Sequence, residues 1–227
     1  MRQAAAGWPC RQWTLSSLQQ ALCGLDVPVA AMASGELQVG GRGLSMQNLP
    51  AQPYFSQLAT GRSGYLMARF DELPASLVAE VPLPDVCRDA AFRASKLWCA
   101  PAGTVTPLHF DLAHNLHAQL DGKKRVLLYP PRPRRPLYPS PPWSGTPNFS
   151  RVDPRQPDLA RYPRFVEARA EEAELEPGDV LYIPSGHWHH VTSERTSISV
   201  NFWWARGWLA QVVRAADWWK RLRGLSR

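Results

Sequence analysis

The sequence has no long apolar segment and few cysteines. No apolar run approaches the roughly 18–20 residues that a membrane-spanning helix needs, and residues 1–13 lack the apolar core of a signal peptide. Cys10, Cys23, Cys87 and Cys99 are widely spaced and form no Cys-x-x-Cys pair, which argues against a structural zinc site and a disulfide scaffold. These absences predict reduced thiols in a cytoplasmic protein.

The chain is long enough, at 227 residues, to bury a substantial core, and its formal net charge is +7. Much of this charge lies in two clusters, at 132–135 and 214–227. Such clusters either serve solubility and local ion pairs or attract an acidic partner, such as a nucleic acid or an acidic peptide. The composition leaves both alternatives open.

The first 91 residues mix short helical and extended segments, which we expect to pack on the main domain. A helix is expected over 14–24, with Thr14 as its N-cap and Gly24 as its stop. The other expected elements are a strand at 27–32, a helix at 51–60, a strand at 64–70, and a turn with a helical segment at 71–81 that Pro74 interrupts.

The pattern changes at residue 92. Between 92 and 204, Gly, Pro and Asp separate short apolar runs, and no segment has the length and periodicity of a helix. This spacing predicts an all-β barrel or sandwich. One interruption, 130–163, holds 11 of the 22 prolines, so it is neither a helix nor a central strand. We expect it to form a structured flap over one end of the barrel.

A C-terminal helix is predicted over 205–224. Apolar residues recur there at spacings of three and four: Trp208, Leu209, Val212, Val213, Ala216, Trp219 and Leu222. This face has three possible uses: packing on the chain's own barrel, a homodimer contact, or binding at a membrane surface.

A His-x-Asp pattern, His109 and Asp111, is the first chemical feature. Residues at i and i+2 of an extended chain project to the same side, so the two side chains can reach a common ion. Alone the pattern is weak. A second block, 177–191, contains a tight turn and a buried strand followed by three histidines.

The histidines leave several choices of ligand. His187 and His189 share a face of an extended chain and His190 lies opposite, so periodicity does not choose among them. His114 and His117 are two further candidates. Two histidines and one carboxylate would form a facial triad, which suits a non-haem Fe(II) oxygenase because it leaves coordination positions open.

Polar and apolar residues alternate along 115–120 and along 197–202. The polar faces point to solvent or, if turned inward, line a polar cavity. Lys124 begins the next strand-like run, and in such a cavity it would pair with a ligand carboxylate. Thr106 and His109 are three positions apart, so in a regular strand their side chains point to opposite faces. Both face one site only if the chain bends near Pro107.

Four motifs together resemble the JmjC-type, cupin-like oxygenases that depend on Fe(II) and 2-oxoglutarate. They are TPLHFD (106–111), NLHAQLDGKKR (115–125), PGDVLYIPSGHWHHV (177–191) and SISVNFWW (197–204). Within this group, the motifs resemble those of the HIF asparaginyl hydroxylase and the JmjC arginyl hydroxylases. GYLMARFDELP (64–74) and the segment 137–165 favour the second group.

The resemblance implies a double-stranded β-helix: N-terminal elements over 1–91, a barrel core over 92–204 with the flap at 130–163, and a C-terminal helix over 205–227 as a possible dimer contact. By position, the family's iron ligands match His109, Asp111 and His189. Its residues around 2-oxoglutarate match Tyr65, Thr106, Asn115, Lys124 and Asn201. Three features depart from the family. A strand usually lies ahead of the position of Gly7, but only six residues precede it here; His117 replaces an aromatic residue of the asparaginyl hydroxylase; and the flap at 130–163 has its own proline pattern.

The function implied by the resemblance is hydroxylation of a protein or peptide side chain, with succinate and CO2 as co-products. Two alternatives remain: an oxygenase acting on tRNA or a small metabolite, and a non-catalytic cupin-like binding module. The basic clusters favour tRNA, although the chain lacks an aromatic RNA-binding signature.

Overall fold

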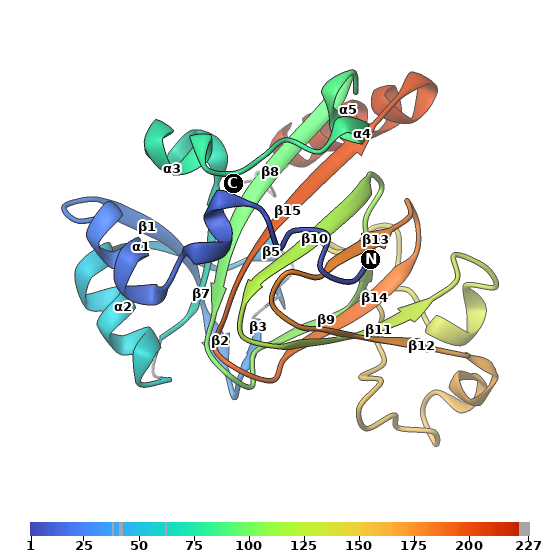
Figure 1. Ribbon diagram of the computed structural model, residues 1–227. Coiled ribbons are helices and arrows are strands. Elements are labelled where there is room, and N and C mark those ends of the chain that lie inside the picture. Colours follow the sequence, from blue (N-terminus) through green and yellow to red (C-terminus); the bar gives the residue numbers. More distant parts are fainter. Residues whose placement is uncertain (38, 41–42, 62, 223–227) are drawn as a thin grey trace.

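Two β-sheets form the walls of one barrel (Figure 1). The computed structural model of the protein describes all residues except 38, 41–42, 62 and 223–227. The large sheet has the order β13 (Val180–Ile183), β10 (His114–Asp121), β15 (Ser197–Ala205), β8 (Phe92–Ala100), β7 (Tyr65–Arg69), β1 (Asp26–Ala30) and β6 (Met46–Pro50). The small sheet has the order β12 (Glu171–Leu175), β11 (Lys124–Tyr129), β14 (Trp188–Ser193), β9 (Val105–Phe110), β3 (Glu36–Leu37) and β2 (Met32–Ala33). The all-β jelly-roll prediction is therefore confirmed.

The remaining elements are short, except for the last helix. The helices are α1 (Leu15–Ala21), α2 (Ala51–Ala59), α3 (Ala75–Ala79), α4 (Asp85–Arg88) and α5 (Gly207–Leu222). Short 3-10 turns cover Pro9–Gln12, Phe70–Glu72, Arg135–Leu137 and Pro163–Glu167, and β4 (Val39–Gly40) pairs with β5 (Gly43–Leu44). The expected cap of α1 is present, because the Thr14 side chain accepts from the Ser17 amide and Gly24 has φ +79°.

Alternation along β10 and β15 turns the apolar residues outward. The outer faces of β7, β8, β10 and β15 form the main core with α1 and α2, which lie on the left of Figure 1. Leu97, Leu116, Val200 and Phe202 contribute to this core and are almost completely buried. The polar residues Asn115 and Asn201 are also buried, so their face lines the barrel interior and not solvent.

The proline-rich segment 130–163 is a structured flap that packs on the outer face of the small sheet, whereas we expected it over one end of the barrel. Its Leu137, Val152 and Tyr162 form a second apolar cluster with Phe110 and Trp188, which belong to β9 and β14. Residues 148–150 also run along β9, since the Phe110 and Ser150 amides donate to the Asn148 and Leu108 carbonyls. The flap therefore reaches the strand that carries the His-x-Asp motif.

Helix α5 packs one face on its own barrel. Ala210 and Val213 are buried against Phe92 and Ala205. Its other side exposes large apolar residues: Trp208, Val212, Trp218, Trp219 and Leu222. The homodimer and membrane alternatives for this exposed side stay predictions.

The tight turn between β10 and β11 fixes where Lys124 begins its strand. Gly122 has φ +74°, and a Cβ atom there would overlap the backbone of Thr196. Any larger residue would displace this turn, and Lys124 with it.

Candidate metal centre

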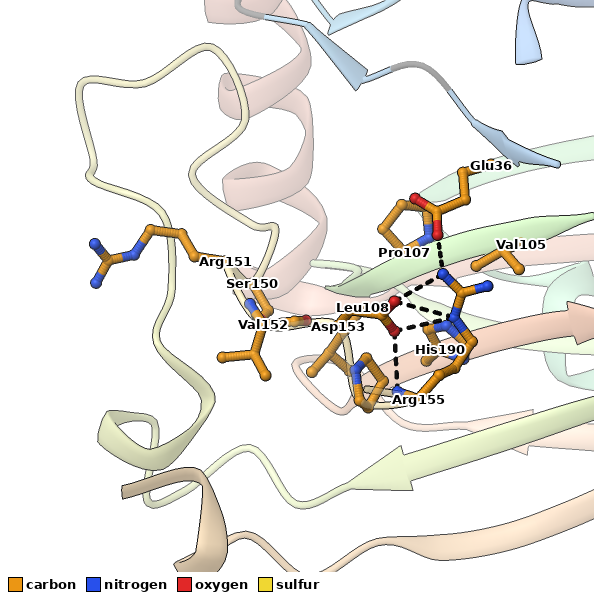
Figure 2. A pocket seen from close by; sticks show the side chains of 11 residues that line it. Glu36, Val105, Pro107, Leu108, Ser150, Arg151, Val152, Asp153, Arg155 and His190 are labelled. Atoms are coloured by element: carbon orange, nitrogen blue, oxygen red, sulfur yellow. Dashed lines mark hydrogen bonds and ion pairs between the residues drawn. The ribbon is translucent and has the colours of Figure 1, made fainter. Parts of the chain in front are cut away.

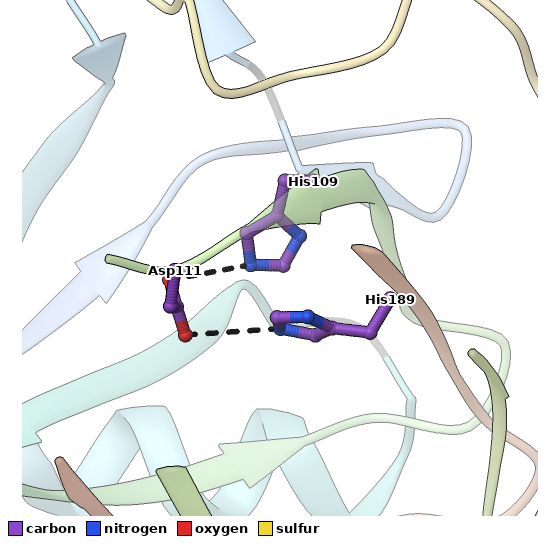
Figure 3. A group of neighbouring side chains, drawn as sticks. All are labelled: His109, Asp111 and His189. Atoms are coloured by element: carbon purple, nitrogen blue, oxygen red, sulfur yellow. Dashed lines mark ion pairs between the residues drawn. The ribbon is translucent and has the colours of Figure 1, made fainter. Parts of the chain in front are cut away.

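His109, Asp111 and His189 come together inside the barrel (Figure 3). His109 on β9 and His189 on β14 are directly paired across the small sheet, and Asp111 follows the end of β9. Asp111 Oδ1 lies 4.0 Å from His109 Nε2, and its Oδ2 lies 3.8 Å from His189 Nε2. Among the described residues, only these three form a group whose ligand atoms lie within 4.8 Å of one another.

Backbone carbonyls orient both imidazoles. His109 Nδ1 lies 2.8 Å from the Pro107 carbonyl, and His189 Nδ1 lies 3.2 Å from the His187 carbonyl. Because a carbonyl can only accept, each Nδ1 must carry the proton and each Nε2 presents a lone pair toward Asp111. The Phe149 ring of the flap also stacks on His109, with ring centroids 5.1 Å apart and an interplanar angle of 16°.

His189 is held in its neutral, metal-binding form. Burial and, to a smaller extent, the neighbouring His109 lower its pKa to about 4. Near neutral pH its Nε2 therefore keeps its lone pair, which a metal ion requires.

Neighbouring donors hold the Asp111 carboxylate. Trp203 Nε1 donates to Asp111 Oδ2 at 2.8 Å, and Asn115 Nδ2 donates to the same oxygen at 3.5 Å. Asn201 Nδ2 in turn donates to Asn115 Oδ1 at 2.7 Å. The two asparagines thus orient one another on the inner face of β10 and β15.

Lys124 is a completely buried cation on the same interior. Its Nζ donates to Ser199 Oγ at 2.7 Å and lies 3.4 Å from the Tyr65 hydroxyl. Burial lowers the pKa of Lys124 to about 7 and raises the pKa of Tyr65, so Tyr65 stays protonated. An enclosed lysine of this kind is poised for an anionic ligand.

Thr106 reaches this group because β9 bends near Pro107. In the pairing of β9 with β14, Thr106 lies opposite Val191 and His109 lies opposite His189. Thr106 and His109 are three positions apart on β9, whereas their partners are two positions apart on β14. The extra residue is a β-bulge, which reverses the facing of the strand. Thr106 interacts with Tyr65, so the bend that the sequence required is present.

The other candidate histidines do not join the triad. His114 lies on the outer side, where it stacks on Tyr182 and Trp204, while His187 contributes only its carbonyl to His189. His117 is buried in the interior beside the site.

His190 faces away from the triad into a separate cavity of about 130 Å3 (Figure 2). Arg155 lines this cavity and forms ion pairs with Asp153 and Glu36. Burial and Arg155 lower the pKa of His190 to about 4. His190 therefore belongs to the contact between the flap and the small sheet.

Three neighbours of the site were not found by inspecting the sequence: Phe149, Trp203 and the pairing of Ser199 with Lys124. Alternation indicated Ser199 as part of a polar face. Trp203 continues that face and Trp204 the apolar one, so the same alternation held a signal for Trp203 that its apolar ring obscured. Phe149 lies in the flap, where no periodicity exists. Their contacts follow only from the folded arrangement.

Comparison with known proteins identifies the family. A family model described as the cupin-like domain matches residues 4–207. The chain belongs to this family.

Curated relatives of this cupin-like chain include JmjC proteins. It is 40% identical over 148 residues to lysine-specific demethylase 8 of Danio rerio, an alignment covering 63% of this chain and 36% of that protein. It is 39% identical over 140 residues to Jumonji C domain-containing protein 5 of Drosophila melanogaster, covering 60% and 34%. It is 30% identical over 218 residues to human tRNA wybutosine-synthesizing protein 5, covering 86% and 67%. The chain thus spans about a third of the length of the first two.

The donor set fits the metal that the JmjC-type cupins use. These proteins depend on Fe(II) and 2-oxoglutarate, and two imidazole nitrogens with one carboxylate suit non-haem Fe(II).

Within the part of the chain that the structure describes, no helix is both long and apolar enough to cross a membrane.

Proposed function

We propose that this cupin-like chain is a 2-oxoglutarate-dependent dioxygenase that hydroxylates a side chain of a protein or peptide. The observation that carries the proposal is the joint presence, in one barrel interior, of the His109–Asp111–His189 triad and the buried Lys124. A triad alone would suit many metal-dependent cupins. The enclosed lysine adds a partner for the second carboxylate of a dicarboxylate.

The chain's own residues would hold the ion and the co-substrate. His109 and His189 would bind Fe(II) through Nε2 and Asp111 through its carboxylate, leaving the remaining coordination positions open. Trp203 and Asn115 would keep the Asp111 carboxylate in place by donating to Oδ2. When bound, iron and 2-oxoglutarate together supply the O2 chemistry that converts the C–H bond to C–OH, with 2-oxoglutarate and O2 giving succinate and CO2.

Lys124 would fix the other end of 2-oxoglutarate. Its ammonium group would pair with the distal carboxylate, while the Tyr65 hydroxyl, itself in contact with Thr106, would donate a hydrogen bond to the same group. Asn115 and Asn201 would line the interior between Lys124 and the metal. This arrangement would hold the co-substrate in one orientation, and a fixed orientation of the reactants would raise the rate.

Anaerobic titration of the apoprotein with Fe(II) and then 2-oxoglutarate tests the proposal. We expect a visible charge-transfer band that needs both additions, is absent in His189→Ala and is weaker in Lys124→Ala. Aerobic incubation should then release succinate from 2-oxoglutarate slowly in the absence of a substrate. No band in the intact wild-type protein would favour a non-catalytic binding module.

A tRNA substrate is the second candidate. Two observations favour it: the net charge of +7, and the similarity to human tRNA wybutosine-synthesizing protein 5 over 86% of the chain. Binding of tRNA that weakens steeply with salt, together with tRNA-stimulated succinate release, would support it over a peptide substrate. Stimulation by peptides alone would support the first candidate.

A further inference from the structure

A buried histidine lies beside the Lys124 end of the site and has no role in the triad. His117 occupies the middle of the inward row of β10, between Asn115 and Gln119, and its side chain is buried. It is paired directly with Asn201 on β15. Directly paired residues of antiparallel strands project from the same face, so His117 and Asn201 share the barrel interior.

The position of Lys124 relates to His117 through β15. Lys124 Nζ donates to Ser199, which is paired with Gln119, and Ser199 lies two residues before Asn201 on the same face. On the inner face, the partner of His117 is therefore the next residue after Ser199, which binds Lys124. Lys124 and His189 both act electrostatically on His117, and the influence of Lys124 is the larger of the two.

The ring nitrogen Nε2 of His117 lacks a well-aligned partner. It is buried, and among the described residues none meets it with the geometry of a hydrogen bond. Gln119 and Asn201 do interact with the His117 side chain, and these interactions oppose the lowering of its pKa without outweighing it. Buried polar atoms are rarely left unpaired in folded proteins, so Nε2 indicates a ligand that brings an acceptor. Burial, with Lys124 and His189, also lowers the pKa of His117, so its imidazole is neutral and can carry a proton on Nε2.

We propose that His117 is a positioning residue whose Nε2–H donates a hydrogen bond to the distal carboxylate of 2-oxoglutarate, which it shares with Lys124. This inference rests on the proposed function. Neutral imidazole adds directionality without a second buried charge, whereas another cation beside Lys124 would be repelled. His117 thereby selects a dicarboxylate over a 2-oxo acid with a single carboxylate.

The test compares His117→Leu with His117→Gln, which retains an N–H donor, and with His114→Leu as a control. His114 lies on the same strand but on the outer side, against Tyr182 and Trp204. Each protein is loaded with Mn(II), and affinity is measured by water-proton relaxation for two probes: 2-oxoglutarate, and 2-oxobutyrate, which lacks the distal carboxylate.

For His117→Leu we expect the Kd of 2-oxoglutarate to rise about tenfold or more, the strength of a hydrogen bond to a charged group. The Kd of Mn(II) and that of 2-oxobutyrate should not change, and His117→Gln should recover part of the loss. The apoprotein melting temperature should not fall, because the substitution replaces a buried polar ring that lacks a well-aligned partner at Nε2 by an apolar side chain of similar volume.

Several results would overturn the inference. An unchanged Kd of 2-oxoglutarate in His117→Leu would show that Nε2 does not contact the co-substrate and that a buried water could be its partner. Equal losses for both probes would place the contact away from the distal carboxylate, and weaker Mn(II) binding would make His117 part of the metal site. If the wild-type protein bound Mn(II) but no 2-oxoglutarate, the proposed function would fail together with this inference.

Discussion

Replacement of Lys124 by methionine should stabilise the apoprotein while it weakens co-substrate binding. Lys124 has 0% exposure, and burial lowers its pKa from 10.5 to about 7. That difference of about 3.5 pKa units corresponds to about 5 kcal/mol of unfavourable free energy for the charged form in the folded protein. Loss of the hydrogen bond to Ser199 offsets roughly 1 kcal/mol of the gain. The expected net stabilisation near pH 6 is therefore about 4 kcal/mol.

The sign of the pH dependence follows from the lowered pKa. Below about pH 7 both the folded and the unfolded chain carry the Lys124 proton, and the full penalty is present. Between about pH 7 and 10.5 the unfolded chain binds a proton that the folded protein has lost. The free energy of unfolding of the wild-type protein should therefore rise there, relative to Lys124→Met, by up to about 1.4 kcal/mol per pH unit.

Urea unfolding of the wild type, Lys124→Met and Lys123→Met between pH 6 and pH 9 measures these quantities. Lys123 is the matched control because it lies next in sequence, reaches the surface and is paired with Glu174 and Glu194, which raise its pKa. Lys123→Met should not be more stable than the wild type, and the difference in unfolding free energy between the two should not shrink as the pH rises. A Lys124→Met variant that is less stable than the wild type, or that keeps a constant difference from it, would refute the reasoning.

Three further predictions concern other parts of the chain. Asp111→Ala should abolish metal binding, measured by titration with Mn(II), without loss of the folded state, since Asp111 is a prospective ligand and not a core residue. Phe149→Ala should weaken Mn(II) binding about tenfold, the effect of removing an outer partner of a ligand, because its ring stacks on His109; unchanged affinity would show that the stacking is incidental. Cys23 is exposed and should react with a thiol reagent in the folded protein, whereas the buried thiols, whose pKa burial raises, should react only after unfolding: Cys10, Cys87 and Cys99.

The strands of the barrel were predictable because their signals are local. Short apolar runs, turn residues and alternation all lie within a few positions of one another, and the alternation in β10 and β15 matches the observed faces. Whether the polar face pointed to solvent or inward was not predictable from alternation alone. The decision depends on the N-terminal segment, a distant part of the chain: the turn Pro9–Gln12 contacts β10, and Trp8 packs on Phe202 of β15.

The site was predictable in its residue types but not in its pairing. The choice of His189 over His187 and His190 depends on the register of β14 against β9, which sets His189 directly opposite His109. The motif resemblance identified His189 because members of one family share the strand register, so that a match by position includes it. Parity showed that Thr106 and His109 could share one site only with a bend near Pro107. The bend is a bulge, and its presence was not predictable because a bulge leaves no periodic trace in the sequence.

The contacts of the flap were predictable neither from local sequence patterns nor from the motif resemblance. Its proline content excluded a helix and a central strand, and its length led us to expect a structured flap; in the structure, the cluster that contains Leu137 and Tyr162 packs it on the small sheet. Nothing in its composition indicated that Phe149 would lie on a metal ligand. Such contacts depend on where a long loop returns to the sheet, which no local preference encodes.

The polar interior itself argues that the barrel is built for a ligand. Replacing a buried charge and its polar neighbours by apolar residues of similar volume is often neutral or stabilising, so Lys124, His117 and Asn201 do not serve folding. The same groups become favourable once a metal ion and a dicarboxylate supply the missing partners. The triad and Lys124 come from the small-sheet side, whereas Asn115, Asn201 and Tyr65 come from the large sheet. Ligands bound between them must therefore join the two sheets, and metal and co-substrate should each strengthen the binding of the other.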